Sequence, residues 1–251
     1  MLCRSAFFHI FAVGMKEWEN RTALLLGKER VEYLHGCHVL VVGLGGVGAY
    51  AAELIARAGV GRMSIVDADK VQPSNINRQL PALHSTVGRP KAHLVESRLK
   101  DINPDLQVFA YREFLKDDRT VALLENNTFD FIVDAIDTVS PKVHLLHNAI
   151  VRAIKVVSSM GAGAKTDPSK VVIDDISKSH TCGLAKAVRS RLKDLGITRG
   201  LPVVFSSEEP DRRAVIFAEN EQNKLTTTGT VSYMPAIFGC YLASYVIRNI
   251  Q

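Results

Sequence analysis

A run of six residues holds glycines at a spacing that binds phosphate groups. The segment Gly43–Gly48 reads G-L-G-G-V-G, so Gly43, Gly45 and Gly48 follow the pattern G-x-G-x-x-G. Such glycines permit a tight turn, let a phosphate approach the backbone, and let a following helix pack closely on the preceding strand. The unpaired N–H groups at the start of that helix then attract the phosphate. The pattern predicts that a nucleotide binds here.

The flanking sequence predicts the elements that would hold this turn. Residues 39–42 are apolar and mostly β-branched, as in a buried parallel strand. Residues 49–59 are rich in alanine and end at a glycine, which predicts a helix. A second strand is expected at residues 63–66. Asp67 at its tip lies about 20 residues beyond the glycines, where an acid accepts a ribose hydroxyl.

Cations and polar side chains follow in the next loops. Amides and one arginine occupy residues 69–80, Lys91 opens a predicted helix, and Asp137 follows a predicted strand at 129–135. A pyrophosphate in a hydride-transferring enzyme binds to backbone amides, whereas a triphosphate that loses pyrophosphate needs cations and a carboxylate that can hold Mg²⁺. The surroundings therefore favour ATP over a dinucleotide. The expected nucleotide ligands are Gly43, Gly45, Gly46, Gly48, Asp67, Asp69, Ser74, Asn75, Asn77, Arg78, Gln79, Lys91, Asp137 and Thr138.

The rest of the chain continues to alternate between strand and helix patterns. Further strands are expected at 106–111, 155–159, 171–173, 203–205 and 214–217, and further helices from Pro90 to about 101 and at 118–125, 141–154, 184–193 and 233–250. We predict an α/β fold, with a Rossmann-like, doubly wound, mostly parallel sheet and an added C-terminal portion of strands and a helix. Ligands bind outside the carboxyl ends of such strands, which would bring Asp137 beside the glycines. No repeat or long linker divides the chain, so residues 15–251 are expected to form a single domain.

Composition limits the classes of protein. The chain has 251 residues, 47% of them hydrophobic, and a formal net charge of +5, which is compatible with nucleic acid. No apolar run reaches the ~18 residues that a membrane helix needs. The four cysteines, Cys3, Cys37, Cys182 and Cys240, form no C-x-x-C pair, which argues against a structural zinc and fits a reducing compartment. We therefore expect a cytoplasmic protein with no zinc and no membrane contact.

Residues 1–14 are mostly apolar, with the single arginine Arg4, and could imitate a short signal peptide. Free cysteines and a site of the ATP type argue against export. We expect these residues to be a non-native or disordered extension, with Met15 as the natural start. The alternative is an organellar presequence, which would place the protein in an organellar matrix.

Several motifs, in order along the chain, resemble one known family. They are the glycine pattern, D-A-D-K-V from Asp67, S-N-I-N-R-Q from Ser74, G-R-P-K ending at Lys91, and D-A-I-D ending at Asp137. Together they are similar to the ThiF/MoeB/HesA family, relatives of the ubiquitin-activating enzymes.

This resemblance implies a set of roles. ATP would lie on the glycines, Asp67 would bind the ribose, Arg78 and Lys91 would hold phosphates, and Asp137 would hold Mg²⁺. An N-terminal arginine, here Arg21, would reach the site of the partner subunit in a homodimer. The implied catalytic residues are thus Arg21, Arg78, Lys91 and Asp137, and the implied reaction is transfer of AMP to a carboxylate.

Within the family, the remainder is most similar to the tRNA threonylcarbamoyladenosine dehydratases. The matching segments include Gly161–Pro168 and Val204–Glu208. This resemblance implies that ATP activates the threonyl carboxylate of the modified adenosine beside the anticodon, which then cyclises with net loss of water. A tRNA substrate would give the basic residues of the helix at Lys186–Arg191, Arg199 and Arg212–Arg213 phosphates to contact.

The sequence leaves several alternative functions open. The first is an adenylyltransferase that activates a ubiquitin-like sulfur-carrier protein, although the zinc-bearing branch has paired C-x-x-C motifs that this chain lacks. The others are a non-catalytic nucleotide-sensing or scaffold protein and a nicotinamide oxidoreductase. Cys182, with His180 and Lys186 nearby, is a candidate nucleophile, but cyclisation needs no thioester. A monovalent cation and a sulfur-transfer partner protein also stay open.

Overall fold

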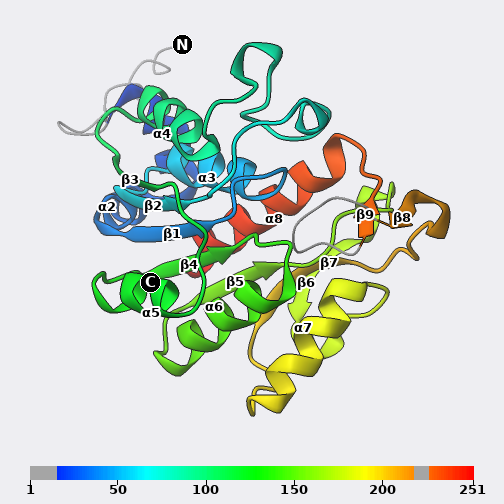
Figure 1. Cartoon of the computed structure of the whole chain (residues 1–251). Coiled ribbons are helices and arrows are strands. Elements are labelled where there is room, and N and C mark those ends of the chain that lie inside the picture. Colours follow the sequence, from blue (N-terminus) through cyan, green and yellow to red (C-terminus); the bar gives the residue numbers. More distant parts are fainter. Residues whose placement is uncertain (1–15, 218–225) are drawn as a thin grey trace, which may run out of the picture.

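The computed structural model describes residues 16–217 and 226–251 (Figure 1). The expected extension at residues 1–14 and the expected start at Met15 lie outside the described residues. No helix of the described residues is both long and apolar enough to cross a membrane.

Strands and helices alternate along most of the chain. The strands are β1 (His38–Val42), β2 (Arg62–Val66), β3 (Gln107–Tyr111), β4 (Phe131–Asp134), β5 (Val156–Ser159), β6 (Val171–Asp175), β7 (Pro202–Ser206), β8 (Val215–Phe217) and β9 (Thr226–Thr228). The α-helices are α1 (Asn20–Leu26), α2 (Lys28–Gly36), α3 (Gly48–Arg57), α4 (Lys91–Ile102), α5 (Asp118–Glu125), α6 (Val139–Val151), α7 (Gly183–Asp194) and α8 (Tyr233–Asn249).

Seven strands form one sheet in the order β3-β2-β1-β4-β5-β7-β6. All neighbours are parallel except β6, which pairs antiparallel with β7. The order of the strands reverses between β1 and β4, because the chain first builds outward through β2 and β3 and then returns to the other side of β1. Such a reversal separates the loops after the two strands and leaves room for a ligand there. The predicted Rossmann-like, doubly wound and mostly parallel sheet is thus confirmed.

Two hydrophobic cores lie on opposite faces of the sheet. Successive residues of a strand point to opposite faces, so Val39 and Val41 join the core under α3, α4 and α8, whereas Leu40 and Val42 join the core under α5, α6 and α7. Figure 1 shows these two sets of helices above and below the strands. Because both faces are covered, the central strands are continuous apolar runs rather than alternating ones.

Some elements differ from the expectation. Pro90 is the N-cap residue of α4 rather than its first helical residue, with ψ of 130°, and the helix starts at Lys91. The antiparallel direction of β6 was not predicted, because the apolar run at 171–173 carries no signal for direction. The ribbon of β8 and β9 was predicted only in its first strand, because β9 is three threonines without an apolar pattern.

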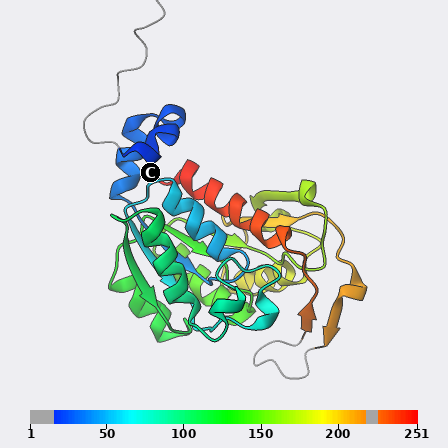
Figure 2. The ribbon, with the colours of Figure 1, turned by 90° about the horizontal axis from the view of Figure 1, so that it is seen from above.

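Helices α3 and α8 lie side by side, which Figure 2 shows from above. Gly239 of α8 makes this close approach possible. A Cβ added there would lie 2.6 Å from the carbonyl oxygen of Val47 and 2.8 Å from Cβ of Tyr50. Since Val47 is the N-cap residue of α3, the contact holds the start of α3 against α8.

We predict that Gly239→Ala destabilises the protein by about 1–3 kcal/mol, because the added methyl group overpacks the contact between α3 and α8. Urea unfolding followed by circular dichroism measures the loss. Gly36→Ala is the control, because a Cβ at Gly36 meets nothing within 4 Å. Equal stability of the two variants would contradict the prediction.

Candidate active site

The glycine turn, Gly43–Gly48, joins β1 to α3, and the packing of the chain itself requires two of its glycines. Gly43 has a φ of +89°, and a Cβ added there would lie 2.7 Å from the carbonyl oxygen of Ala135, just after β4. A Cβ at Gly48 would lie 1.8 Å from the carbonyl oxygen of Gly43. At Gly45 the nearest atom would be Nε2 of Gln79, at 3.6 Å. Close packing therefore explains Gly43 and Gly48, while no backbone atom crowds Gly45.

Asp67 binds the glycine turn directly. Its Oδ2 accepts a hydrogen bond from the backbone N–H of Leu44 at 2.7 Å, and its Oδ1 accepts one from the N–H of Asp69 at 2.8 Å. Burial raises the pKa of Asp67 even though Lys91 and these N–H groups favour the charged form. A carboxylate has about four lone-pair sites, so each oxygen keeps capacity for a hydroxyl donor. Asp67 thus shapes the turn and is still able to accept a ribose hydroxyl.

Lys91 is a buried cation at the start of α4, with 4% of its surface exposed. Its Nζ lies 2.8 Å from Oδ2 of Asp69, whose side chain is 70% exposed. Its backbone N–H also donates to the carbonyl oxygen of Asp69. A buried ammonium group needs a partner of opposite charge, and the exposed Asp69 is one that a phosphate group could replace. Lys91, Asp69 and Asp67 therefore form one cluster beside the glycine turn.

The loop from Pro73 to Leu80 carries Arg78, whose side chain is half-buried. Nη1 of Arg78 donates to the carbonyl oxygen of Ser74 at 3.0 Å and to Oδ1 of Asn77 at 2.8 Å. Asn75 is buried, and its Oδ1 accepts from the N–H of Gln72 while its carbonyl oxygen accepts from Arg78 and Gln79. The side chain of Asn75 thus folds the loop, and the loop aims the guanidinium group of Arg78.

Two side-chain oxygens at this edge of the sheet are buried and have no hydrogen-bond partner in the protein. They are Oε1 of Gln79, beside Gly45, and Oγ1 of Thr138, the N-cap residue of α6. Nearly all buried polar atoms in proteins are paired, so each of these atoms calls for an explanation. Oε1 of Gln79 can pair only with a donor such as a hydroxyl group, whereas Oγ1 of Thr138 can also donate to a phosphate oxygen.

Asp137 is exposed and lies at the carboxyl end of β4, one residue before Thr138. The described residues hold no group of three or more His, Cys, Asp or Glu side chains that could enclose a metal ion. Mg²⁺ needs no such group, because it is commonly bound by one or two carboxylates together with phosphate oxygens and water. Asp137 at the nucleotide edge therefore fits Mg²⁺ carried by a triphosphate.

A buried ion pair supports the loop that carries Asp137. Nζ of Lys142 lies 2.7 Å from Oδ2 of Asp134, and both side chains are 0% exposed. Asp134 also accepts from Oγ of Ser158 at 2.6 Å and from the N–H of Ile136, while Lys142 donates to the carbonyl oxygen of Ile136. Lys142 was missed in the sequence, because it appears as one polar residue in an amphipathic helix. The one signal in the sequence that could have identified Lys142 is its position, one helical turn after the D-A-I-D motif.

Two candidate residues are not brought to this cluster. Arg21 is exposed on α1, which precedes α2 and so lies near the amino end of β1, opposite the glycine turn. Cys182 is the N-cap residue of α7, and its Sγ accepts from the N–H groups of Gly161 at 3.3 Å and Ala185 at 3.5 Å. His180 stacks edge-on against Phe205, with ring centroids 5.4 Å apart. In the single chain, Cys182 thus caps a helix.

Known proteins resemble this chain over almost its full length. The profile of the ThiF family matches residues 19–251. A tRNA threonylcarbamoyladenosine dehydratase of Bacillus subtilis is 39% identical over 242 residues, which cover 92% of this chain and 93% of the relative. The crystal structure of an Escherichia coli tRNA N6-threonylcarbamoyladenosine dehydratase with ATP aligns with a TM-score of 0.85 at 31% identity, covering 95% and 97% of the two chains. The same protein has also been crystallised with AMP. A molybdopterin-synthase adenylyltransferase of Salmonella typhimurium matches a shorter part, 65% of this chain.

We predict that Lys142→Met destabilises the protein by about 3–5 kcal/mol, because it leaves the carboxylate of Asp134 buried without its cation. Urea unfolding measures the effect. The double variant Lys142→Met, Asp134→Leu removes both charges and is expected to recover most of the loss. A Lys142→Met variant as stable as the wild type would show that the pair does not support the fold.

Proposed function

The chain belongs to the ThiF family, and on that premise we propose that it is an ATP-dependent tRNA threonylcarbamoyladenosine dehydratase. The observation that carries the proposal is the cluster at the glycine turn, where a buried lysine, a loop arginine and two unpaired side-chain oxygens meet at one edge of the sheet. We take residues 15–251 to be one catalytic unit.

The proposed first step is transfer of AMP. A carboxylate oxygen of the threonyl group attacks the α-phosphorus of ATP, a P–O bond forms, and the bond to pyrophosphate breaks. Arg78 and Lys91 would neutralise the charge that develops on the leaving phosphates. Lys91 would exchange Asp69 for a phosphate oxygen, so its buried charge stays paired throughout. Asp67 would hold the ribose and thereby align the α-phosphorus with the attacking oxygen.

Mg²⁺ is proposed to bind at Asp137, where it would screen the charge of the phosphates when bound. The buried pair of Asp134 and Lys142 would position Asp137 by holding the backbone of Ile136 from both sides. Oε1 of Gln79, which the protein leaves unpaired, would accept a hydrogen bond from a hydroxyl or amino group of the nucleotide, and the unpaired hydroxyl group of Thr138 would donate to or accept from it.

The proposed second step needs no nucleophile from the protein. An atom of the carbamoyl part of the side chain forms a bond to the activated carbonyl carbon and releases its proton to solvent, while the bond from that carbon to the AMP oxygen breaks. AMP thus leaves with one oxygen of the original carboxylate, and together with the released proton this accounts for the net loss of water. Because both reacting groups belong to one substrate molecule, the enzyme only has to hold them in position and exclude water. The position of Cys182 agrees with a reaction that uses no protein nucleophile, because its sulfur accepts hydrogen bonds from the backbone N–H groups of Gly161 and Ala185.

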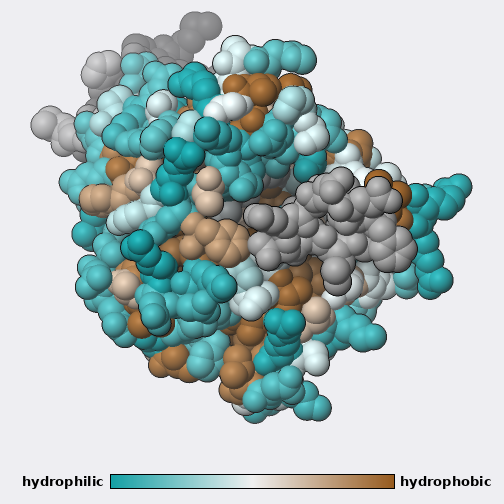
Figure 3. Space-filling view, viewed as in Figure 1, coloured by the Kyte–Doolittle hydropathy of each residue, from teal (hydrophilic) through white to brown (hydrophobic). Residues whose placement is uncertain are grey.

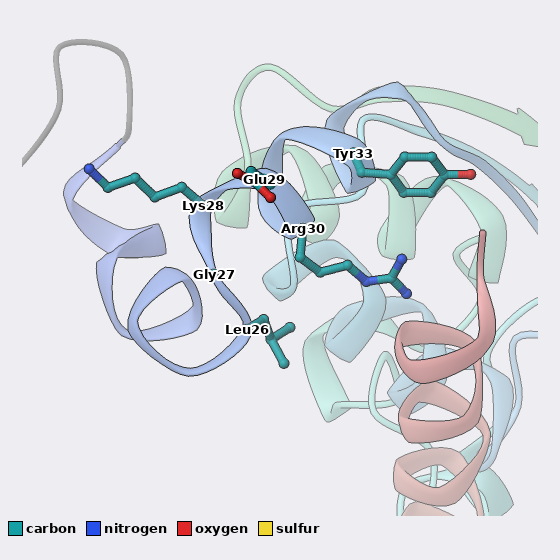
Figure 4. A pocket seen from close by; sticks show the side chains of 6 residues that line it. All are labelled: Leu26, Gly27, Lys28, Glu29, Arg30 and Tyr33. Atoms are coloured by element: carbon teal, nitrogen blue, oxygen red, sulfur yellow. The ribbon is translucent and has the colours of Figure 1, made fainter.

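We further propose that two copies of the chain form a homodimer through α1 and α2. Leu24 and Leu25 of α1 are 80% and 83% exposed, which is unusual for neighbouring leucines and is typical of an interaction surface. An open cavity of about 670 Å³ lies at the junction of the two helices, lined by Leu26, Gly27, Lys28, Glu29, Arg30 and Tyr33 (Figure 4). Arg21 lies on the same short helix, so a partner docked there would explain how Arg21 reaches a nucleotide.

We predict that Arg78→Ala and Lys91→Ala each lower the rate of pyrophosphate release by about 10²–10³-fold, because each removes a charge that the transition state needs. The assay contains ATP, Mg²⁺ and tRNA that carries threonylcarbamoyladenosine, and mass spectrometry of the nucleosides detects the cyclic product.

Lys70→Ala is the matched control, because Lys70 is exposed and lies one residue from Asp69 without entering the cluster. It is expected to keep the wild-type rate. A wild-type protein that releases pyrophosphate with a sulfur-carrier protein ending in Gly-Gly, but not with tRNA, would overturn the proposed substrate.

A mixture of two inactive variants tests the role of Arg21. If Arg21 acts on the site of the partner subunit, Arg21→Ala and Lys91→Ala are each inactive, but their mixture regains up to about one quarter of the wild-type activity, because mixed dimers contain one complete site. Nucleoside mass spectrometry measures the recovery. A mixture no more active than its components, although subunit exchange is seen by mass spectrometry of the intact dimers, would show that Arg21 does not act across the dimer.

A further inference from the structure

A face of α7 carries cations that the nucleotide cluster does not use. Lys186, Arg189 and Lys193 follow the spacing i, i+3, i+7 and so lie on one side of the helix, whereas Ala185, Val188 and Leu192 are buried on the other. With Ser177, Ser190 and Thr198, the three cations line a cavity of about 310 Å³. We call these six residues the α7 pocket. In the view of Figure 3, hydrophilic residues lie beside hydrophobic ones in the lower part of the molecule, where Figure 1 places α7.

The cations of the α7 pocket are not neutralised by acids. Among the ion pairs of the described residues, none includes Lys186, Arg189 or Lys193. Arg189 is held in place by Ser179, whose carbonyl oxygen and Oγ accept from its Nη1 at 2.7 Å each. Asp175 precedes Ser177, but its carboxylate accepts from the backbone N–H groups of Ser177 and Gly200. The pocket thus presents positive charge and hydroxyl groups, the groups that bind phosphate oxygens.

Two other exposed basic residues, Arg213 and Lys178, are paired with acids. Arg213 forms an ion pair with Asp211 at 2.8 Å, and that aspartate has its pKa lowered to about 2 by hydrogen bonds from the side chain and backbone of Arg213. Lys178 pairs with Asp174 at 3.0 Å. The unpaired cations of the α7 pocket are therefore stronger candidates for phosphate contact than Arg213 and Lys178.

The α7 pocket also has a suitable position. Cys182, which caps α7, accepts a hydrogen bond from the N–H of Gly161, the second residue after β5, so α7 begins at the carboxyl edge of the sheet where the nucleotide cluster lies. From there α7 runs back along the sheet. Lys186 to Lys193 span about 10 Å of helix, which suits a polymer backbone better than a single anion.

We propose that the α7 pocket binds the phosphate backbone of the tRNA whose modified adenosine occupies the nucleotide site. This inference rests on the proposed function and adds to it the surface that holds the RNA outside the reacting nucleotide. The contacts are to phosphates and are therefore independent of base sequence.

The test compares charge reversals on one helix. The double variant Lys186→Glu, Lys193→Glu removes two phosphate contacts, and Arg191→Glu is the matched control, because Arg191 is exposed but lies about 140° around α7 from Lys186. The probe is a fluorescently labelled anticodon stem-loop that carries threonylcarbamoyladenosine, and anisotropy is measured over a range of salt concentrations. Binding of a fluorescent ATP analogue and the melting temperature report on the fold.

The double variant is expected to bind the stem-loop at least tenfold more weakly, with a salt dependence that is flatter by about 1.5 in log–log slope, while ATP binding is unchanged. The Arg191→Glu variant is expected to bind RNA like the wild type. Wild-type affinity in the double variant, or an equal loss in Arg191→Glu, would overturn the proposal. A wild-type protein that binds the stem-loop through these lysines, but forms no cyclic nucleoside with ATP, would retain the surface and refute only the proposed function.

Discussion

Backbone contact at the glycine turn is the constraint on which the site depends. A Cβ at Gly43 would lie 2.7 Å from the carbonyl oxygen of Ala135, and a Cβ at Gly48 would lie 1.8 Å from the carbonyl oxygen of Gly43, both closer than such atoms can approach. The ends of β1 and β4 and the start of α3 can therefore meet only if these two positions are glycine. This close meeting brings Asp137 and Thr138, at the end of β4, next to the turn. The separation of the loops after β1 and β4, which follows from the strand order, leaves this edge open.

The two buried lysines at this edge of the sheet each form an ion pair with an aspartate. One of these aspartates is buried and stays paired, and the other is exposed and can be replaced by a ligand. Asp134 and Lys142 are permanent partners, since both are fully buried and share the backbone of Ile136. A buried ion pair contributes little net stability but strongly disfavours any arrangement that separates the charges. Lys91 instead pairs with the exposed Asp69, which a phosphate oxygen can replace. The buried Asp134 therefore serves to support the site, whereas the exposed Asp69 leaves Lys91 available for a ligand.

The two ends of the proposed substrate call for different surfaces. The nucleotide edge offers backbone N–H groups, two cations and unpaired oxygens within a few residues of one turn, which suits a compact triphosphate. The α7 pocket offers cations spread along a helix, together with hydroxyl groups, which suits a chain of phosphates. Both surfaces follow from the α/β architecture. The helix α7 leads into the parallel strand β7, so it must start at the carboxyl edge of the sheet, which is also the edge at which the nucleotide is proposed to bind.

Local patterns in the sequence were sufficient for most elements and for the candidate ligands of the nucleotide. The helix Asp118–Glu125 was predicted with the bounds that the structure has, and the order of strands and helices around the glycine turn was predicted correctly, because apolar periodicity reports the local backbone and its buried face. The tertiary structure alone decided the antiparallel direction of β6, the pairing of Lys142 with Asp134, and the use of the Asn75 side chain within its own loop. The tertiary structure also showed that Arg213 forms an ion pair with an aspartate, whereas Lys186 forms no ion pair with a described residue. These outcomes depend on which groups are brought together by the sheet order and on which of them are removed from water, and neither is encoded in the spacing of residues along the chain.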